Sequence, residues 1–424
     1  MCLALVMGNM IGSGIFLLPA ALAPYGWNAV GGWLFTVGGV MLVAAVLARL
    51  ARALPEAAGP YGYAQAAFGD LPAFLISYSY WNAGWIGNAA IVTGAVSYLS
   101  VLTPGLAAIP GVTAATSVGL IWIVTLISLR GARSAGGFQV VTTLIKLIPL
   151  LLVVTLAALV TGSTRGSALL AFSPTDLSIP AIGAAAALCL WALVGFESAT
   201  LATASIASPS TTVPRATLLG VSLTGLVYLL ACSGIVLLMP VAVLTASSAP
   251  FADFVGQYWG AGIALFIVLC AAISALGALN SSTLIQGVIP ASLVRAGTLP
   301  PGFAAPNAAG APAGALVVSG LLTTVLVLLN SSRSLGEAFA FTALLATSVT
   351  LFLYLGVAAA ALKLRVGGPL AVGAVLFVFW TLWGAGLVAS GWSLVLLLTG
   401  VPVFWFVQWR LRRNVVLVPG SRLS

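Results

Sequence analysis

The sequence predicts an all-α integral membrane protein of about twelve transmembrane helices, and three observations lead to this fold class. Hydrophobic residues make up 61% of the 424 residues, whereas charged residues make up only 5%. The mean hydropathy of +1.19 is higher than a soluble core requires, and it also excludes a disordered chain. Apolar segments recur along the whole chain, and roughly 35 residues for a span with its loop gives about twelve helices.

Short loops separate the apolar segments, and none of these loops is long enough for a soluble domain. The spans are expected at residues 1–23, 30–53, 71–101, 113–129, 137–162, 179–206, 216–240, 257–286, 314–330, 338–362, 369–391 and 393–409. The connections at 57–63 and 298–302 are rich in Gly and Pro, which predicts turns or short re-entrant pieces. The first segment lacks a basic start, so a cleavable signal peptide is not expected.

Basic residues are distributed unevenly between the two sets of loops. If the amino terminus lies in the cytoplasm, only Arg165 and Arg333 fall in the opposite loops, and Lys146 lies within a span. The other twelve of the fifteen basic residues are cytoplasmic: Arg49, Arg52, Arg130, Arg133, Arg215, Arg295, Lys363, Arg365, Arg410, Arg412, Arg413 and Arg422. The positive-inside rule therefore predicts a multi-pass protein of the cytoplasmic (inner) membrane with both termini cytoplasmic. The net charge of +9 lies in these loops and does not indicate nucleic-acid binding.

Residues 9–19 are the least regular part of the first span. Gly12 and Gly14 flank Ser13, so the backbone can leave the helix there at low steric cost. One interpretation is that these small residues allow two helices to pack closely. The other is a break, whose freed N–H groups and positive dipole end would suit a carboxylate.

The number of spans favours a helix break at Gly12–Gly14 over close helix packing. Spans one to five and six to ten form two sets of five, so the second set must insert in the opposite orientation. The sixth span contains another candidate interruption at 193–198, and paired interrupted helices indicate a transporter site at the membrane midplane. We expect a first repeat at 1–162, an inverted second repeat at 163–366, and two additional helices with a cytoplasmic tail at 367–424.

Two ionisable residues lie deep within spans. Inserting Lys146 or Glu197 at a helix centre costs at least about 2.5–3.5 kcal/mol of free energy on insertion scales, so each is expected to have a structural or functional role. A structural interpretation is an ion pair between the fifth and sixth spans, or a lysine that extends to the interface. A functional interpretation is proton coupling by Lys146 and Glu197.

The third span presents small and polar residues on one helical face. Tyr80, Gly84, Gly87 and Asn88 share this face, which either lines a substrate or packs in the core. Trp191, on the sixth span, has the same two interpretations.

Other functional classes are disfavoured. The chain has four cysteines without CxxC spacing and no histidine, so we expect no disulfide, metal or cofactor. No cluster of carboxylates indicates an enzyme. A membrane sensor would normally carry a soluble output domain.

Five motifs, in this order and spacing, carry a resemblance to a known family. They lie at 12–19, 59–69, 80–88, 195–198 and 213–217. With them, the chain resembles the amino acid–polyamine–organocation (APC) transporter superfamily, and within it the basic amino acid/polyamine antiporter branch. The resemblance covers nearly the whole chain. It implies the inverted five-plus-five helix fold with broken first and sixth helices and two further helices; a homodimer is compatible with it, although no feature requires one.

The resemblance also implies the roles of individual residues. The substrate carboxylate would lie at the first break and the substrate amino group at the sixth-helix break. Trp191 would cover the substrate, and Tyr80 with Glu197 would form an outer gate. The implied substrate-binding residues are Ile11, Gly12, Ser13, Gly14, Ala83, Gly84, Asn88, Trp191, Val194, Ser282 and Thr342.

Departures from this branch bear on the substrate. Ser282 stands where arginine-binding members have a tryptophan, whose cation–π contact is worth about 2 kcal/mol. Lys146 stands where proton-coupled relatives carry a lysine, so sodium coupling is not expected. Only about a dozen residues precede the first break, so we expect the chain to begin inside its first half-helix.

These observations predict a secondary active transporter of L-amino acids. The absent tryptophan and the small number of acidic residues, six, favour a neutral substrate, with proton coupling or exchange. The alternative is a cationic amino acid/polyamine antiporter. The expected partners are the small-molecule substrate and membrane lipid.

Overall fold

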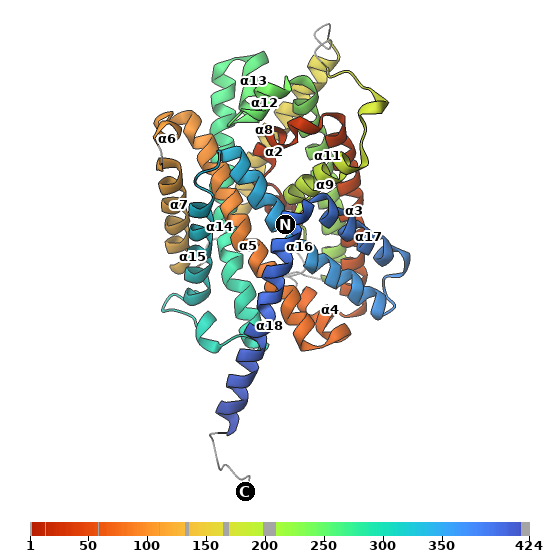
Figure 1. Cartoon of the computed structure of the whole chain (residues 1–424), viewed down its shortest axis with the longest axis vertical. Helices are drawn as coiled ribbons and strands as arrows, with labels where there is room; N and C mark the ends of the chain where they lie inside the picture. Colours follow the sequence, from red (N-terminus) through yellow and green to blue (C-terminus); the bar gives the residue numbers. More distant parts are fainter. Residues whose placement is uncertain are drawn as a thin grey trace.

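The computed structural model describes residues 2–12, 14–57, 59–109, 111–131, 135–163, 169–197 and 209–416, which form a bundle of α-helices (Figure 1). Within these residues, seven helices are long and apolar enough to cross a membrane. Five shorter apolar helices accompany them: Gly14–Tyr25, Ile145–Thr161, Ile179–Leu193, Ala313–Leu329 and Gly368–Gly384. The predicted all-helical fold class is confirmed.

The principal helices follow the apolar segments along the chain. In order they are α1 (Cys2–Met10), α2 (Gly14–Leu22), α3 (Trp27–Ala53), α4 (Gly59–Phe68), α5 (Asp70–Leu102), α6 (Gly105–Ala108), α7 (Val112–Leu129), α8 (Ala135–Thr161), α9 (Ile179–Leu193), α11 (Pro209–Leu238), α12 (Val241–Thr245), α13 (Pro250–Trp259), α14 (Ala261–Arg295), α15 (Ala313–Leu329), α16 (Leu335–Lys363), α17 (Gly368–Gly384) and α18 (Gly386–Val416). Short 3-10 turns lie at Ala23–Tyr25, Pro174–Asp176 and Pro301–Ala304.

The outside of the bundle is apolar. Leu387 on α18 is 94% exposed, and large side chains such as Leu376 and Trp405 are also exposed. In water these surfaces would drive aggregation, whereas in a bilayer they face lipid. Several hydroxyls inside the bundle are satisfied within their own helix; Thr36 and Thr350, for example, donate to the carbonyl four residues earlier. This distribution is that of a multi-pass membrane protein.

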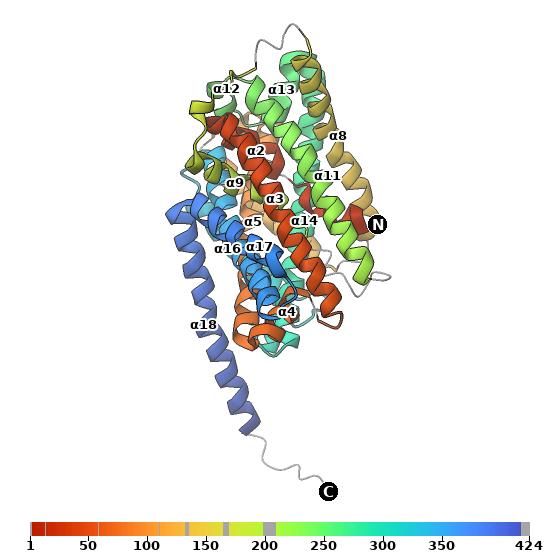
Figure 2. The same ribbon diagram turned by 90° about the vertical axis from the view of Figure 1, so that its right-hand side faces the viewer.

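Helix α5 lies at the centre of the packing. Both α14 and α16 pack against it, and α16 also contacts α9. Figure 2 shows α18 along one side of the bundle and extending beyond it, with α4 near one end and α12 and α13 at the other. Near α4, the Lys363 ammonium lies 4.9 Å from the centre of the Phe68 ring.

Several predicted boundaries are corrected by the structure. The boundary expected between residues 391 and 393 is wrong, because α17 ends at Gly384 and α18 begins at Gly386, where φ is +83°. The eighth span continues as a helix to Arg295 rather than ending at 286. The Gly/Pro-rich stretch after α3 forms the helix α4, and a positive φ at Gly69 then redirects the chain into α5.

A helix ends at each of the two predicted interruptions, and residues 198–208, where the sixth span would resume, lie outside the described residues. The first helix stops at Met10 and resumes as α2 at Gly14, and α9 stops at Leu193. Ser13, Ser198, Arg133, Arg165 and Arg422 lie outside the described residues.

Candidate functional site

The two helix interruptions meet in space. After α9, Val194 is extended (φ −60°, ψ 140°) and Gly195 has φ +113°. A Cβ at position 195 would lie only 3.1 Å from the carbonyl oxygen of Asn9, at the end of α1. A positive φ together with this close approach requires glycine. The irregular backbone from the two halves of the chain therefore lies in contact.

A cavity of about 120 Å³ opens beside these interruptions. A single water needs roughly 10–15 Å³ on this measure, so the space suits a small organic molecule rather than one solvent molecule. Its lining comes from α1, α2, α5, α9, α14 and α16. The lining residues are Gly8, Asn9, Met10, Gly12, Gly14, Tyr80, Ala83, Gly84, Gly87, Ile91, Trp191, Ala192, Val194, Gly195, Ala278, Ser281, Ser282, Ile285, Gln286, Ile289 and Thr350.

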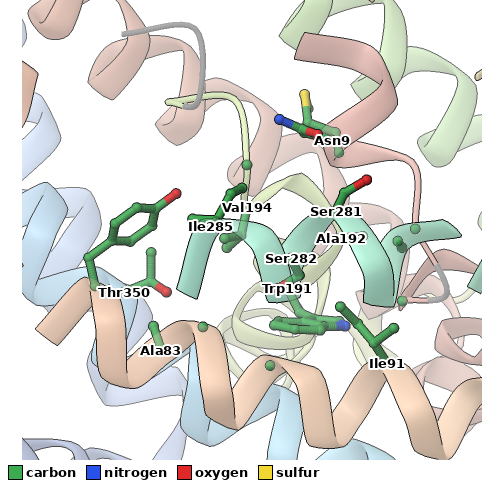
Figure 3. Close-up of a pocket in the computed structure, with 18 of the residues that line it drawn as sticks. Asn9, Ala83, Ile91, Trp191, Ala192, Val194, Ser281, Ser282, Ile285 and Thr350 are labelled. Atoms are coloured by element: carbon green, nitrogen blue, oxygen red, sulfur yellow. The ribbon is translucent and has the colours of Figure 1, made fainter. Parts of the chain in front are cut away.

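The Trp191 indole occupies the middle of this site. Figure 3 shows it between the helix that carries Ala83 and Ile91 and the helix that carries Ser282. A Cβ at Gly14 would lie 2.5 Å from Trp191 Nε1, and one at Gly87 would lie 2.9 Å from its Cη2. Glycines on both sides therefore make room for the ring. Among the described residues, Trp191 Nε1 has no hydrogen-bond partner.

The helix ends provide complementary polar groups. The first N–H groups of α2, beginning at Gly14, have no acceptor within the helix, and the helix dipole makes this end positive. The last carbonyls of α9 form a negative end close by. One end suits a carboxylate and the other suits an amine, which is the pattern of a free amino acid backbone.

Glu197 joins three parts of the bundle through hydrogen bonds. The Tyr80 hydroxyl donates to Glu197 Oε1 at 2.8 Å, and the Tyr354 hydroxyl donates to Oε2 at 3.0 Å. The Gly195 amide also donates to Oε2, at 3.2 Å. Glu197 is fully buried, and Tyr80 lies between it and the cavity that Tyr80 lines. The carboxyl group therefore couples α5 and α16 to the interruption after α9.

Lys146 supports the other interruption. Its ammonium is buried and donates a hydrogen bond to the carbonyl oxygen of Gly8 at 3.1 Å. In a continuous helix this carbonyl would accept from the amide four residues later, at Gly12. The break removes that donor, and the side chain of α8 supplies another.

The structure places eight predicted site residues at the cavity: Gly12, Gly14, Tyr80, Ala83, Gly84, Trp191, Val194 and Ser282. Ile11, Asn88 and Thr342 do not line it. The Thr342 hydroxyl instead donates to the carbonyls of Ala338 and Phe339, at 2.7 and 3.1 Å. Glu197 and Lys146 each contact a lining residue.

Sequence reasoning missed Gln286, Thr350 and Asn9, which also line the cavity. Gln286 lies one turn after Ser282, so helical spacing along the eighth span indicates it. Thr350 lies about two turns after Thr342 on the same helix. The predicted Thr342 and the lining residue Thr350 therefore lie on the same helix, α16, at different depths.

A comparison with known families identifies the chain. The family model described as amino acid permease matches residues 2–414. The chain belongs to the amino acid permease family. This permease is therefore a member of the APC superfamily, as the resemblance implied, and its family is one of transporters.

Three relatives of the permease place it in the basic amino acid/polyamine antiporter branch. It is 35% identical over 342 residues to the cadaverine/lysine antiporter of Escherichia coli (strain K12), covering 79% of this chain and 75% of the relative. It is 31% identical over 395 residues to the putative arginine/ornithine antiporter of Bacillus subtilis (strain 168), covering 86% and 83%. It is 29% identical over 348 residues to the putrescine transporter PotE of Escherichia coli (strain K12), covering 79% and 76%.

Proposed function

We propose that this permease exchanges cationic amino acids and diamines across the cytoplasmic membrane by alternating access. The observation that carries the proposal is the cavity between the two helix interruptions, in a chain whose relatives are named for lysine, cadaverine, arginine, ornithine and putrescine. This substrate class was the alternative interpretation of the sequence. The relatives support it over the neutral amino acid that the sequence favoured.

In this proposal, the substrate carboxylate binds the N–H groups at the start of α2, near Gly14. The α-amino group binds the last carbonyls of α9, around Val194, and Trp191 covers the substrate. No basic side chain lines the cavity within the described part of the chain, although the Lys146 ammonium lies one hydrogen bond behind Gly8 of its wall. Glu197 provides negative charge behind Tyr80, one hydrogen bond from the cavity.

The proposed architecture is five-plus-five helices in inverted repeats, followed by α17 and α18. In it, the two interruptions occupy equivalent places, and rocking of one set of helices against the other opens the site to each side in turn. Both termini would lie in the cytoplasm, on the side of α4. Lys146 would hold the end of α1 in the way that a coupling ion does in other branches, so its protonation would set the coupling.

A neutral amino acid is the second candidate, and Ser282 is the observation that favours it. This residue lines the cavity with a small hydroxyl-bearing side chain where a guanidinium would need an aromatic face. A neutral substrate would use the same two helix ends and leave Glu197 as a gate only.

The first test is thermal stabilisation of the purified protein by each of the twenty L-amino acids and by putrescine and cadaverine. Ligand at a hundredfold excess over Kd stabilises the native state by about 2.7 kcal/mol. Shifts with lysine, ornithine or the diamines, followed by exchange of the same compounds in proteoliposomes, support the proposal. Shifts with neutral amino acids alone would replace it with the second candidate.

A further inference from the structure

Gln286 is a buried polar side chain to which the proposed binding of the carboxylate and α-amino groups assigns no role. It lies on α14, is 1% exposed, and lines the cavity. Neither Nε2 nor Oε1 of its amide has a hydrogen-bond partner among the described residues. Buried amides are almost always paired in folded proteins, so an amide unpaired at both atoms on a cavity wall indicates a ligand.

The structure makes room for this amide. A Cβ at position 84 of α5 would overlap Gln286 Nε2, so glycine at 84 allows the amide to lie against the helix. Trp191 lies over Gly87 of the same helix, one turn further along, and reaches Gly14 at the start of α2. The rise between Gly84 and Gly87 is about 4.5 Å. The start of α2, the Trp191 indole and the Gln286 amide therefore follow one another along α5.

This order suits an unbranched aliphatic ligand. Its carboxylate or amine end would bind at the helix ends, its methylene groups would lie against Trp191, and its distal group would reach Gln286. The neighbouring wall is apolar, with Ile285 and Ile289 on the same helix. Beside these apolar side chains, the Gln286 amide oxygen is an unpaired acceptor available to a distal donor.

We infer that Gln286 determines specificity by accepting a hydrogen bond from the distal primary ammonium of the substrate. The inference rests on the proposed function and narrows it to ligands with a terminal ammonium, such as lysine, ornithine and the linear diamines. An ammonium is satisfied by single acceptors placed around it. A guanidinium is planar and binds best to a carboxylate fork or an aromatic face, and this wall of the cavity offers neither.

The test compares lysine with norleucine, which has the same unbranched chain length but lacks the distal ammonium. Inhibition constants for both are measured against exchange in proteoliposomes, for the wild type and for Gln286→Leu and Gln286→Glu. Gln257→Leu is the matched control, because Gln257 is exposed on α13, away from the cavity. The thermal melting of each variant confirms that it is folded.

In the wild type, lysine should inhibit at least about tenfold more strongly than norleucine, the size expected for one hydrogen bond to a charged group. Gln286→Leu should remove most of this preference, because it should weaken inhibition by lysine and leave inhibition by norleucine unchanged. Gln286→Glu should increase it, because a carboxylate attracts the ammonium more strongly than an amide does. Gln257→Leu should leave the preference unchanged.

Two results would overturn the inference, and they are distinguishable from each other. A lysine preference that stays within twofold of the wild type in both Gln286 variants removes the role of Gln286 but leaves the proposed function standing. A wild type that prefers norleucine refutes the proposed function itself, and the inference with it. If Gln286→Leu fails to fold, the Gln286→Glu result decides in the same way.

Discussion

The Lys146 ammonium donates to the carbonyl of Gly8 across 3.1 Å, and this hydrogen bond joins α8 to the end of α1. The carbonyl lacks its helical donor because the first helix breaks after Met10. A charged side chain thus takes the place of a main-chain amide where the backbone is irregular. Gly8 also lines the cavity, so the protonation state of Lys146 and the shape of the site are connected.

We predict that Lys146→Ala abolishes the pH dependence of transport, or abolishes net uptake while exchange persists. The variant removes the cationic side chain that the structure places against the end of α1. Uptake and exchange are measured in proteoliposomes over a range of pH. Lys363→Ala, at the far end of α16, is the control and should behave like the wild type. A wild-type pH profile in Lys146→Ala would remove this residue from the coupling mechanism.

We predict that Tyr80→Phe and Tyr354→Phe destabilise the protein similarly but affect transport differently. Each variant removes one hydrogen bond to the Glu197 carboxyl group, which costs about 1–3 kcal/mol when a buried group is left unpaired. Only Tyr80 lines the cavity, so Tyr80→Phe should reduce the exchange rate more strongly. Thermal melting and exchange rates check the two parts separately. Equal transport defects would mean that Glu197, and not the position of Tyr80, controls the gate.

We predict that Gly14→Ala lowers substrate affinity at least about fivefold. The new methyl group would lie 2.5 Å from Trp191 Nε1, so the indole must move out of the site. A displacement of this kind in a packed interior costs about 1–3 kcal/mol, which corresponds to roughly 5- to 150-fold in affinity. Gly38→Ala on α3 is the control: apart from the adjacent backbone of its own helix, no described atom would lie within 4 Å of the new Cβ, and alanine favours the helix. Ligand-induced melting shifts measure both variants.

We predict that Trp191→Ala weakens or abolishes exchange, because the indole fills the space between α2 and α5 over the substrate. Removing a large aromatic side chain costs about 3–5 kcal/mol where it is fully packed. Trp191 already borders a cavity, so the loss of stability should be smaller. Trp392→Ala, on the exposed face of α18, should leave exchange intact. Unchanged uptake in Trp191→Ala would show that the site has been assigned to the wrong cavity.

Much of the fold of this protein can be predicted from its sequence, because a membrane restricts the possible folds so strongly. Hydropathy alone predicts the helices, since every backbone polar group within a bilayer must be paired inside a helix or a closed barrel. Local residue chemistry predicts the breaks as well. Gly12, Gly14 and Gly195 permit conformations that other residues resist, and Glu197 and Lys146 are too costly within a span to lack partners.

Only the tertiary structure decides which residues surround the cavity. Spacing within one helix shows that residues share a face, but it does not show what that face meets. The sequence therefore predicts Thr342, whereas packing places Thr350 at the cavity, and it passes over Gln286, whose isolation appears only when α14 lies against Gly84 of α5. The sequence also left open the partner of Lys146, because Gly8 lies more than a hundred residues away along the chain, whereas the family resemblance had already paired Tyr80 with Glu197. The sequence determined which backbone could break and which charges needed partners. The packing of distant helices determined what those groups face.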